Sequence, residues 1–270
     1  MNLADKLEDL KKRIAEKGKI LVAYSGGVDS SLLARVAHDA LGGNSLAVIL
    51  DSRVMPRSEL LSARELAASL GFNYRIAEFP ILKEEQFCTN PVTRCYICKK
   101  KSAAVLKSIA REEGIGCIAD GVNLSDFRDY RPGIAACDEE GIWHPFVDAA
   151  ITKEDIRALA HNLGLDVWNK PSAACLASRI PYGQTITPES LRMVQEAEEY
   201  LRSLGFLQLR VRSHSRVARI ELQEQDMVTA MNCRDKIAKT LKAIGFDYVA
   251  LDLEGFRSGS MDEGLMKEVV

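Results

Sequence analysis

The sequence carries almost no net charge, because 36 basic residues are set against 38 acidic ones and the formal charge at pH 7 is −2. Such a balance gives no global field that would attract nucleic acid or an anionic membrane, although a local basic site remains compatible with it. No apolar run is long enough to cross a bilayer, and residues 1–5 open a charged amphipathic helix without the apolar core of a signal peptide. We therefore expect a cytoplasmic protein that binds neither nucleic acid nor a membrane.

A disulfide framework is not expected either. The seven cysteines are an odd number in a chain without an export signal, so some of these thiols are expected to bind metal or to react. The chain also lacks internal repeats and low-complexity tracts. With 47% hydrophobic and 27% charged residues it has the composition of an ordinary soluble protein, and 270 residues suffice for two unequal domains.

Strand and helix patterns alternate along the first part of the chain. Apolar residues between Leu3 and Ile14 recur at helical spacing, and Gly18 ends that pattern before an apolar run at 20–24 that predicts a buried strand. Further elements are strands at 46–50, 74–77 and 116–119, helices through 32–37 and over 57–70 and 95–113, and a polar loop at 120–133. This alternation predicts an α/β fold with a doubly wound parallel sheet.

A second composition begins after Pro171, where a loop of small residues leads into a turn-rich stretch near Gly183. We place the domain boundary there, which gives domains of residues 1–180 and 181–270. The second domain shows a helix at 188–203, strands at 206–212 and 217–222, a helix at 226–243 and a strand at 246–252. This order predicts a smaller α+β domain with an antiparallel sheet.

A phosphate-binding loop is predicted where the first strand turns into a helix. Its residues are Ser25, Gly26, Gly27, Val28, Asp29 and Ser30. The glycine pair lets backbone N–H groups approach an oxyanion, the helix N-terminus adds partial positive charge, and both serine hydroxyls can donate to phosphate oxygens. The carboxylate of Asp29 would repel phosphate unless a cation such as Mg²⁺ lies between them. The alternative is a glycine-rich turn that only caps the helix.

This loop differs from other nucleotide-binding motifs. It has no Gly-Lys-Ser or Gly-Lys-Thr and is therefore not a Walker A loop, and it lacks the G-x-G-x-x-G dinucleotide pattern. It resembles the S-G-G-x-D-S signature of PP-loop enzymes, which implies cleavage of ATP between its α- and β-phosphates. Asp51 ends the second predicted strand, where such sheets bind a nucleotide, although a role in a surface turn is nearly as plausible.

Two cysteines form a C-x-x-C pair at the start of a predicted helix. Cys95 and Cys98 precede three lysines at 99–101, and the helix dipole together with these ammonium groups should lower the thiol pKa values. Cys175 is a third candidate, because its loop of small residues gives it room and access. Two of its neighbours could bind phosphate, Ser178 and Arg179.

Three thiolates without an evident fourth ligand fit a 4Fe-4S cluster that keeps one iron open for chemistry. Zinc would need a fourth ligand, which Cys88, Cys137 or His144 could supply. A structural zinc site is therefore the main alternative, followed by a redox-active C-x-x-C pair. Cys117 in an apolar strand and Cys233 inside a predicted helix are interpreted as small buried hydrophobic residues.

Two arginines share one face of the first strand in the second domain. Strand alternation puts Leu207 on the apolar face, and Arg210 and Arg212 about 6.6 Å apart on the other face. The two guanidinium groups could hold one phosphate or carboxylate from both sides, oriented by Glu198 or Glu221. The alternative is a solvated edge strand.

Taken in order along the chain, these features resemble the LarE-type sulfur transferases, which make the nickel-pincer nucleotide cofactor of lactate racemase. The resemblance spans nearly the whole sequence and rests on the order and spacing of its parts. The parts are the phosphate loop, Asp120-Gly121-Val122-Asn123 with Arg131-Pro132-Gly133, the segment Pro171 to Arg179, the Arg210-Val211-Arg212 strand, and the ending Leu251-Asp252-Leu253-Glu254-Gly255.

The resemblance implies a PP-loop ATP pyrophosphatase domain that binds ATP and Mg²⁺, with Gly121 beside the nucleotide, and a second domain for substrate binding or oligomerisation. It implies adenylation of the carboxylates of pyridinium-3,5-biscarboxylic acid mononucleotide, release of pyrophosphate, and displacement of AMP by sulfur to give a thiocarboxylate. Cys175 matches the active cysteine of the family. The substrate-binding residues implied in the same way are Ser178, Arg179, Glu198, Arg210 and Arg212.

The resemblance also bears on the sulfur source. In some members of the family a single cysteine gives up its own sulfur and becomes dehydroalanine. In members with an additional C-x-x-C pair, three cysteines hold a 4Fe-4S cluster whose open iron delivers an extra sulfide. Cys95 and Cys98 favour the second type for this chain, with Cys175 as the third cluster ligand and an external sulfide donor as a partner. The family resemblance separately implies a homo-oligomer.

Three other interpretations stay open. A tRNA-thiolating PP-loop enzyme would share the three cysteines, but the near-neutral charge and the lack of a zinc ribbon or basic tail speak against it. Ammonia-using relatives such as NAD or GMP synthetases share the loop but do not require the cysteines, and the chain has no glutaminase portion. A nucleotide-sensing module without turnover would use the thiols only for structure.

Overall fold

The computed structural model describes residues 2–128, 132–171, 175–257 and 259–261. Arg131 and residues 172–174, which belong to motifs noted in the sequence, lie outside the described residues. The chain forms two compact units. The first contains residues 1–81 and 93–173, and the second contains residues 82–92 and 174–270.

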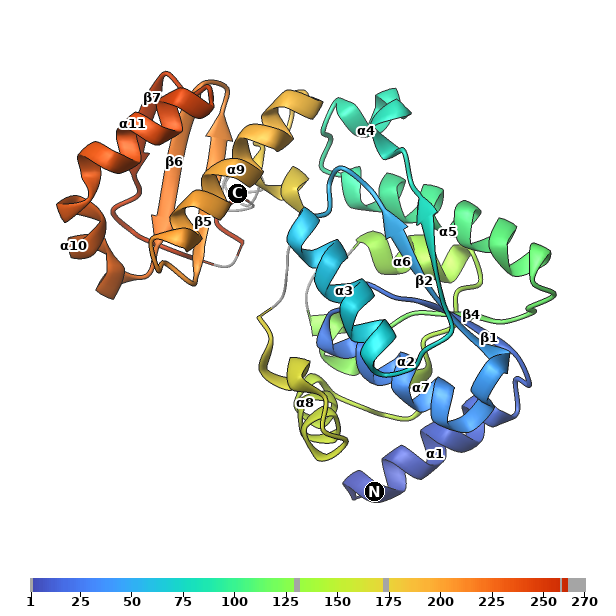
Figure 1. The fold of residues 1–270 in the computed structure, drawn as a ribbon. Coiled ribbons are helices and arrows are strands. Elements are labelled where there is room, and N and C mark those ends of the chain that lie inside the picture. The colour runs from blue at the N-terminus through green and yellow to red at the C-terminus, as the bar shows by residue number, and fades with distance from the viewer. Residues whose placement is uncertain (1, 129–131, 172–174, 258, 262–270) are drawn as a thin grey trace. The chain divides into compact units, whose positions relative to one another are not determined.

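The first unit is built on a parallel sheet with the strand order β3-β2-β1-β4 (Figure 1). Its strands are β1 (Ile20–Ala23), β2 (Ser45–Asp51), β3 (Tyr74–Glu78) and β4 (Ile118–Ala119). Leu21 of β1 pairs with Leu46 on one side and with Ile118 on the other. The strand order reverses between β1 and β4, so the loops that follow these two strands meet at the carboxyl edge of the sheet.

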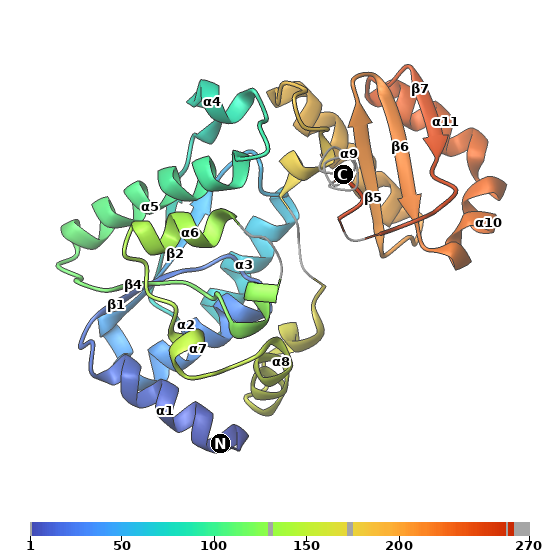
Figure 2. The same cartoon turned by 180° about the vertical axis from the view of Figure 1, so that it is seen from behind.

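Helices cover both faces of this sheet, which confirms the predicted doubly wound fold (Figures 1 and 2). Ile20 and Val22 join the core built with α1 (Leu3–Ala15), α2 (Val28–Leu41), α3 (Arg57–Ser69), α7 (Pro145–Asp148) and α8 (Lys153–Asn162). Leu21 joins the opposite core, with α5 (Arg94–Glu112) and α6 (Pro132–Glu139). The change of face from residue to residue follows from the two-residue period of a strand.

Short helical turns complete the first unit, and they show where the sequence prediction was incomplete. The segment predicted as a polar loop at 120–133 contains the 3-10 helix η3 (Leu124–Arg128) and the start of α6. Asn123 closes this turn by donating from Nδ2 to Asp126 Oδ2 at 2.8 Å. Such short elements bury too few apolar residues to leave a periodic pattern. The others are η1 (Gly42–Asn44) and η4 (Asp166–Asn169), with η2 (Ile81–Lys83) at the passage between the units.

The second unit packs helices against a three-stranded sheet with the order β5-β6-β7. Its strands are β5 (Leu209–His214), β6 (Val217–Leu222) and β7 (Tyr248–Leu251). Its helices are α4 (Glu85–Cys88), η5 (Leu176–Arg179), α9 (Pro188–Ser203), α10 (Glu224–Asn232) and α11 (Arg234–Ile244). The α+β prediction is confirmed, but the prediction of an antiparallel sheet is wrong for β7. That strand runs parallel to β6, because α10 and α11 form a crossover between the two strands.

Two further details of the second unit differ from the prediction. The helix predicted at 226–243 is two helices that meet at Cys233. Its apolar period hides the break, since Ala230 before it and Ile237 after it enter the same core. Strand β5 begins at Leu209, where it pairs with the last residue of β6, so Leu207 lies before the strand and is 86% exposed.

Asn90 links two segments of the second unit that are far apart in sequence. It is fully buried, has a φ of 57°, and donates from Nδ2 to the carbonyls of Ile180, Pro181 and Gln184 at 3.1, 2.7 and 3.1 Å. These hydrogen bonds fix the segment 82–92 to the loop that precedes α9. Within the described ranges, no helix is both long and apolar enough to cross a membrane.

Candidate functional site

The phosphate loop joins β1 to α2 at the carboxyl edge of the first sheet. The Ser30 hydroxyl accepts a hydrogen bond from the Ser25 amide at 3.1 Å, lies 3.1 Å from the Ser25 hydroxyl and donates to the Gly27 carbonyl at 3.2 Å. Gly27 is the N-cap residue of α2 and provides no side-chain cap. The first amide groups of this helix can therefore donate to an anion.

Two glycines allow the close approaches that this loop requires. Gly26 has a φ of 73°, and a Cβ there would lie 2.6 Å from the Cβ of Ala63 on α3. A Cβ on Gly121 would lie 2.9 Å from the Cβ of Asp29 and 3.1 Å from the amide nitrogen of Ser30. Any larger residue at these positions would push a neighbouring segment away from the loop. The loop after β4 is thus brought directly against the phosphate loop.

A lysine that the sequence interpretation missed contacts the phosphate loop. Lys153 Nζ lies 2.7 Å from Asp29 Oδ1, and Asn123 Nδ2 donates to the same oxygen at 3.4 Å. The side chains of Lys153 and Asp29 are 31% and 27% exposed. The ammonium group of Lys153 is therefore a cation beside Asp29 that can reduce repulsion between this carboxylate and a phosphate.

One local pattern in the sequence marks Lys153 as unusual, namely its position at the start of a capped helix. Thr152 and Asp155 form a capping box, with the Thr152 hydroxyl accepting from the Asp155 amide at 3.3 Å, so α8 begins at Lys153. A cation in the first helical turn opposes the helix dipole at a cost of about 0.3–1 kcal/mol. A lysine at so unfavourable a position indicates a role other than stability. Its partner could not be predicted, because Asp29 is 124 residues away.

The phosphate loop borders a cavity of about 480 Å³ within the first unit. Ser25, Asp29 and Ser30 form a polar side of it. An apolar side is formed by residues of β2, its following loop and α5, namely Val48, Leu50, Met55, Ala103 and Leu106. A cavity of this size with a phosphate-binding edge and an apolar slot suits a nucleotide with several phosphates.

A buried charge pair supports another part of the cavity wall. Asp120 Oδ1 accepts hydrogen bonds from His144 Nδ1 at 2.6 Å and from the Val122 amide at 3.1 Å. Burial lowers the pKa of His144, but Asp120 and Asp138 outweigh burial and leave that pKa raised. Burial raises the pKa of Asp120, but His144, the charge of Lys99 and the Val122 amide together outweigh burial and leave that pKa lowered. His144 Nε2 lies 3.2 Å from Asp138 Oδ1, so both ring nitrogens face carboxylates and are poorly placed for zinc.

Asp51 ends β2 where the sequence predicts it, but its carboxylate is engaged outside the cavity. Arg57, at the start of α3, donates to Asp51 Oδ1 at 2.7 Å and to the Ser52 carbonyl at 2.5 Å. Asp51 is not among the residues that line the cavity. Its observed role is to fix the loop after β2, which carries Met55 into the cavity wall.

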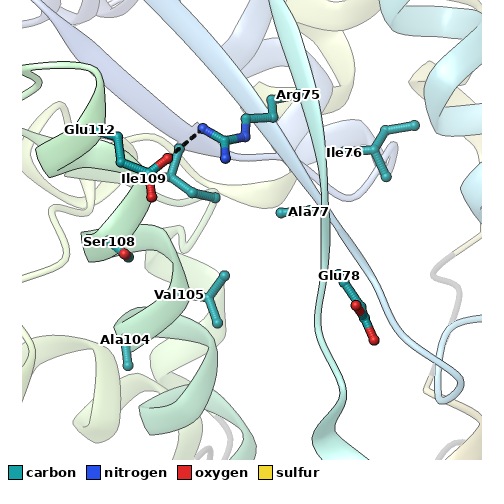
Figure 3. Close-up of a pocket in the computed structure, with 9 residues that line it drawn as sticks. All are labelled: Arg75, Ile76, Ala77, Glu78, Ala104, Val105, Ser108, Ile109 and Glu112. Carbon is teal, nitrogen blue, oxygen red and sulfur yellow. Dashed lines mark hydrogen bonds and ion pairs between the residues drawn. The ribbon is translucent and has the colours of Figure 1, made fainter.

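A second hollow of about 570 Å³ lies between β3 and α5 (Figure 3). Ala77, Val105 and Ile109 give it an apolar part, and Arg75 and Glu112 form an ion pair of 2.9 Å at its rim. None of the predicted site residues lines this hollow. It is therefore separate from the candidate site.

None of the seven cysteines, all of which the structure describes, forms a disulfide. Cys95 is exposed and Cys98 half-buried in the first turn of α5, three residues apart and thus on one helix face, in the first unit. Cys175 is exposed in the second unit. Among the described residues, no group of three or more His, Cys, Asp or Glu side chains is arranged as metal ligands. Thiol sulfur is nevertheless the ligand type that iron–sulfur clusters use.

The other cysteines are less suited to metal. Burial raises the pKa of the Cys137 thiol to about 11, and burial also raises the pKa of Cys88, whose thiol donates to the Leu82 carbonyl at 3.3 Å. A raised thiol pKa disfavours the thiolate that binds zinc. Cys117 lies directly before β4, not inside it, and is half-buried against the core. Cys233 lies between two helices, and the prediction that it is inside one helix is wrong.

The second unit contains a buried cluster of arginines and glutamates. Arg179 Nε donates to Glu198 Oε1 at 2.8 Å, and Glu198 also accepts from Arg202 at 2.9 Å and from the Val211 amide at 3.2 Å. Burial raises the pKa of Glu198, but the charge and hydrogen bond of Arg179, together with the charges of Arg202 and Arg210, outweigh burial and leave that pKa lowered. Arg179 Nη1 also donates to the Cys175 carbonyl at 3.2 Å. Arg179 therefore links the buried cluster to the backbone of Cys175.

Arg210 and Arg212 lie on the same face of β5, as predicted, but in different surroundings. Arg212 donates to both oxygens of Glu221, at 3.0 and 2.8 Å, and to the Ser178 carbonyl at 3.0 Å. Arg210 has no carboxylate within ion-pair distance in the described part of the chain. Its Cζ lies 5.1 Å from the ring centre of Phe256. Arg210 is thus the guanidinium of β5 that no described carboxylate neutralises.

The cluster carries more positive than negative charge. Burial, together with repulsion from Arg179, lowers the pKa of Arg210 to about 10. Cations that are removed from water without a counter-ion are costly, so the cluster favours a bound phosphate or carboxylate. The two buried carboxylates, Glu198 and Glu221, are surrounded by Arg179, Arg202, Arg210, Arg212 and Arg219.

Comparison with known proteins agrees with these features. A family model described as NAD synthase matches residues 2–93. The pyridinium-3,5-bisthiocarboxylic acid mononucleotide synthase of Lactiplantibacillus plantarum is 39% identical over 266 residues, which cover 98% of this chain and 96% of that protein. An uncharacterised protein of Synechocystis sp. is 41% identical over 268 residues, 98% of this chain and 100% of that protein.

A more distant similarity covers less of the chain. One of the subunits of the glutamine-hydrolysing GMP synthase of Methanopyrus kandleri is 30% identical over 210 residues, 71% of this chain and 64% of that polypeptide. The likeness to the L. plantarum synthase, by contrast, runs through both units and includes the phosphate loop and the arginine cluster within its span. The chain therefore belongs to the LarE-type sulfur transferases, ATP-utilising enzymes of the PP-loop superfamily.

Proposed function

We propose that this enzyme adenylates the carboxylates of pyridinium-3,5-biscarboxylic acid mononucleotide and converts them to thiocarboxylates during nickel-pincer nucleotide synthesis. The proposal is supported by the name of the L. plantarum relative, which describes the bisthiocarboxylic acid product. One observation carries it. Arg179 joins the carbonyl of the exposed Cys175 to an arginine cluster with excess positive charge. A reactive thiol beside an anion site suits a phosphorylated acceptor of sulfur.

The first step uses the phosphate loop. A carboxylate oxygen of the substrate attacks the α-phosphorus of ATP, the bond from that phosphorus to the bridging oxygen breaks, and pyrophosphate leaves with the electron pair. The amide groups at the start of α2 and the ammonium group of Lys153 stabilise the charge that develops on pyrophosphate. The step turns a poor leaving oxide into AMP.

Two carboxylates of the first unit fit a magnesium ion. Asn123 Nδ2 donates both to Asp126 Oδ2 at 2.8 Å and to Asp29 Oδ1 at 3.4 Å, so the two acidic side chains share one donor. Hard carboxylate oxygens are the ligands that Mg²⁺ prefers. Asp29 and Asp126 would hold the ion, which would neutralise negative charge on the phosphates when bound.

The second step delivers sulfur to the adenylate. A sulfur nucleophile attacks the acyl carbon, the bond to the AMP oxygen breaks, and a thiocarboxylate remains. The cysteine loop is held for this step by Ser178, whose hydroxyl donates to the Cys175 carbonyl at 2.7 Å. Cys95, Cys98 and Cys175 are the proposed ligands of a 4Fe-4S cluster, which would supply a sulfide at its open iron. In that version Cys175 stays intact, whereas a sacrificial Cys175 would lose its sulfur in a single turnover.

The substrate is itself a mononucleotide, and its phosphate requires an anchor. Arg210 is the proposed anchor, because no described carboxylate neutralises it and Arg179 keeps the surroundings positive. Arg212 is held by Glu221 and adds positive charge from a fixed position. Removal of the Arg210 guanidinium is expected to weaken binding of the mononucleotide and to leave ATP binding unchanged.

The substrate assignment is tested by pyrophosphate release. Purified protein is given Mg²⁺-ATP with the pyridinium dicarboxylate mononucleotide, with tRNA, or with nicotinate adenine dinucleotide. We expect release only with the dicarboxylate, and release only with tRNA would contradict the proposal.

The sulfur source is tested by anaerobic purification followed by iron, sulfide and zinc analysis. We expect about four iron atoms per chain in the wild type, few in Cys98→Ala, and a wild-type content in the matched control Cys233→Ala. One zinc per chain without iron would refute the cluster. A loss of one sulfur from Cys175 after turnover, seen by mass spectrometry, would indicate the sacrificial route instead.

A further inference from the structure

The described residues after β7, 252–257 and 259–261, contact the arginine cluster of the second unit. The Phe256 amide donates to the Leu222 carbonyl at 2.8 Å, which ties Phe256 to the end of β6. Its ring lies beneath the Arg210 guanidinium, with 5.1 Å between Cζ and the ring centre. The sequence interpretation assigned Phe256 no role.

A second residue of the segment enters the cluster at the neighbouring arginine. Ser260 is 7% exposed, and its hydroxyl donates to Glu221 Oε1 at 2.7 Å and accepts from Arg212 Nη2 at 3.0 Å. The hydroxyl therefore bridges the two groups of a buried ion pair. The segment contacts both arginines of β5 with two different kinds of side chain.

Gly255 fixes the point where this segment turns. It has a φ of 73°, and a Cβ there would lie 2.7 Å from the Leu222 carbonyl oxygen, the same oxygen that accepts from the Phe256 amide. Only glycine allows this approach without moving the backbone. The position of the Phe256 ring is thus determined by backbone geometry.

The Phe256 ring stabilises the positive charge of Arg210. This guanidinium is partly removed from water, lies in the field of Arg179 and has no described carboxylate partner. The face of an aromatic ring stabilises such a cation without neutralising it, so the arginine stays available to an anion. The contact also restricts the motion of the guanidinium, which reduces the entropy lost when a phosphate binds.

We propose that Phe256 is a positioning residue of the mononucleotide site, whose ring holds the Arg210 guanidinium ready for the phosphate of the ligand. Ser260 has the corresponding role for Arg212 through its bridge to Glu221. This inference rests on the function proposed above, in which the cluster binds the phosphate of a pyridinium mononucleotide. It assigns the segment after β7 to substrate recognition.

The probe for the test is nicotinamide mononucleotide, which has a pyridinium ribose phosphate but lacks the two carboxylates. Its dissociation constant is measured by calorimetry with the full chain. Phe256→Leu keeps apolar volume and removes the ring face, and we expect the dissociation constant to rise about three- to thirtyfold, the range of a partly desolvated cation–π contact. Phe256→Trp keeps a ring face and should bind within about twofold of the wild type.

Two controls separate a loss of stacking from a loss of folding. ATP affinity of the same samples should be unchanged, because the phosphate loop lies in the first unit. Arg210→Gln should weaken binding of the probe about a hundredfold or more, since it removes the charge itself. A normal ATP affinity together with rescue by tryptophan would exclude a general folding defect.

The outcomes distinguish the inference from the proposed function. Equal affinities of wild type and Phe256→Leu, with weak binding by Arg210→Gln, would overturn the role of Phe256 and leave the phosphate site in place. Equal affinities of wild type and Arg210→Gln would overturn the phosphate site and this inference together. Equal losses in Phe256→Leu and Phe256→Trp would show that packing rather than stacking matters, and would also overturn the inference.

Discussion

Replacing Lys153 with methionine removes the ammonium group that lies 2.7 Å from Asp29 and keeps an unbranched side chain. Two unit charges about 4 Å apart interact by about 4 kcal/mol at an effective dielectric constant of 20. Both side chains are close to one-third exposed, at 31% and 27%, so solvent screening reduces this to about 2–3 kcal/mol. If Lys153 acts on the departing pyrophosphate, the rate of pyrophosphate release should fall about thirty- to a hundred-and-sixtyfold.

The assay combines pyrophosphate release with urea unfolding. A partly exposed ion pair contributes only about 0–1 kcal/mol to the free energy of unfolding, so Lys153→Met should lose activity with little loss of stability. Lys153→Arg keeps the charge and serves as the matched control. Adding Asp29→Asn should not restore the rate, because the lysine would still be missing from the pyrophosphate. A Lys153→Met rate within threefold of the wild type would refute the reasoning.

Three further predictions concern stability. Gly26→Ala should lower the free energy of unfolding by about 1–3 kcal/mol in urea, because its Cβ would meet Ala63 and its φ is 73°; a neutral result would contradict the close approach. His144→Asn should lower the free energy of unfolding more near pH 5.5 than near pH 8.5. The folded protein raises the His144 pKa, so the stability from this residue is fully present below pH 6.5 and is lost as the pH rises through the pKa of the folded state. The opposite trend would count against the ion pair of His144 with Asp120. Asn90→Ala should cost about 2–4 kcal/mol, because one buried and two partly buried carbonyls lose the donor that they share; thermal unfolding would detect this, and an unchanged midpoint would contradict it.

Much of the first unit could be predicted because its signals are local. The apolar run at Ile20 and the glycines that follow it specify a buried strand, a tight turn and a helix N-terminus within a few residues. The phosphate loop therefore emerges from the sequence with its chemistry. Lys153 does not, because its position depends on how α8 packs beside α2 and not on neighbouring residues.

In the second unit the chemical pattern was easier to predict than the geometry. Alternation along β5 correctly put Arg210 and Arg212 on one face, but it could not show that Glu221 holds only one of them. The direction of β7 within the sheet also escaped prediction, because the sequence does not show which strand β7 pairs with. Beside β5 it would be antiparallel, whereas beside β6, where it lies, it is parallel. The contact of Phe256 with Arg210 joins residues without any shared sequence pattern.

The central claim is that this enzyme uses ATP to place sulfur on a carboxylate of a pyridinium mononucleotide. The most direct measurement is mass spectrometry of the products after incubating anaerobically purified protein with that dicarboxylate, Mg²⁺-ATP and sulfide. The account predicts AMP and a product in which sulfur has replaced one carboxylate oxygen, while Cys175→Ala forms the adenylate without the thiocarboxylate. Unchanged dicarboxylate beside intact ATP, from protein that binds both, would contradict the account.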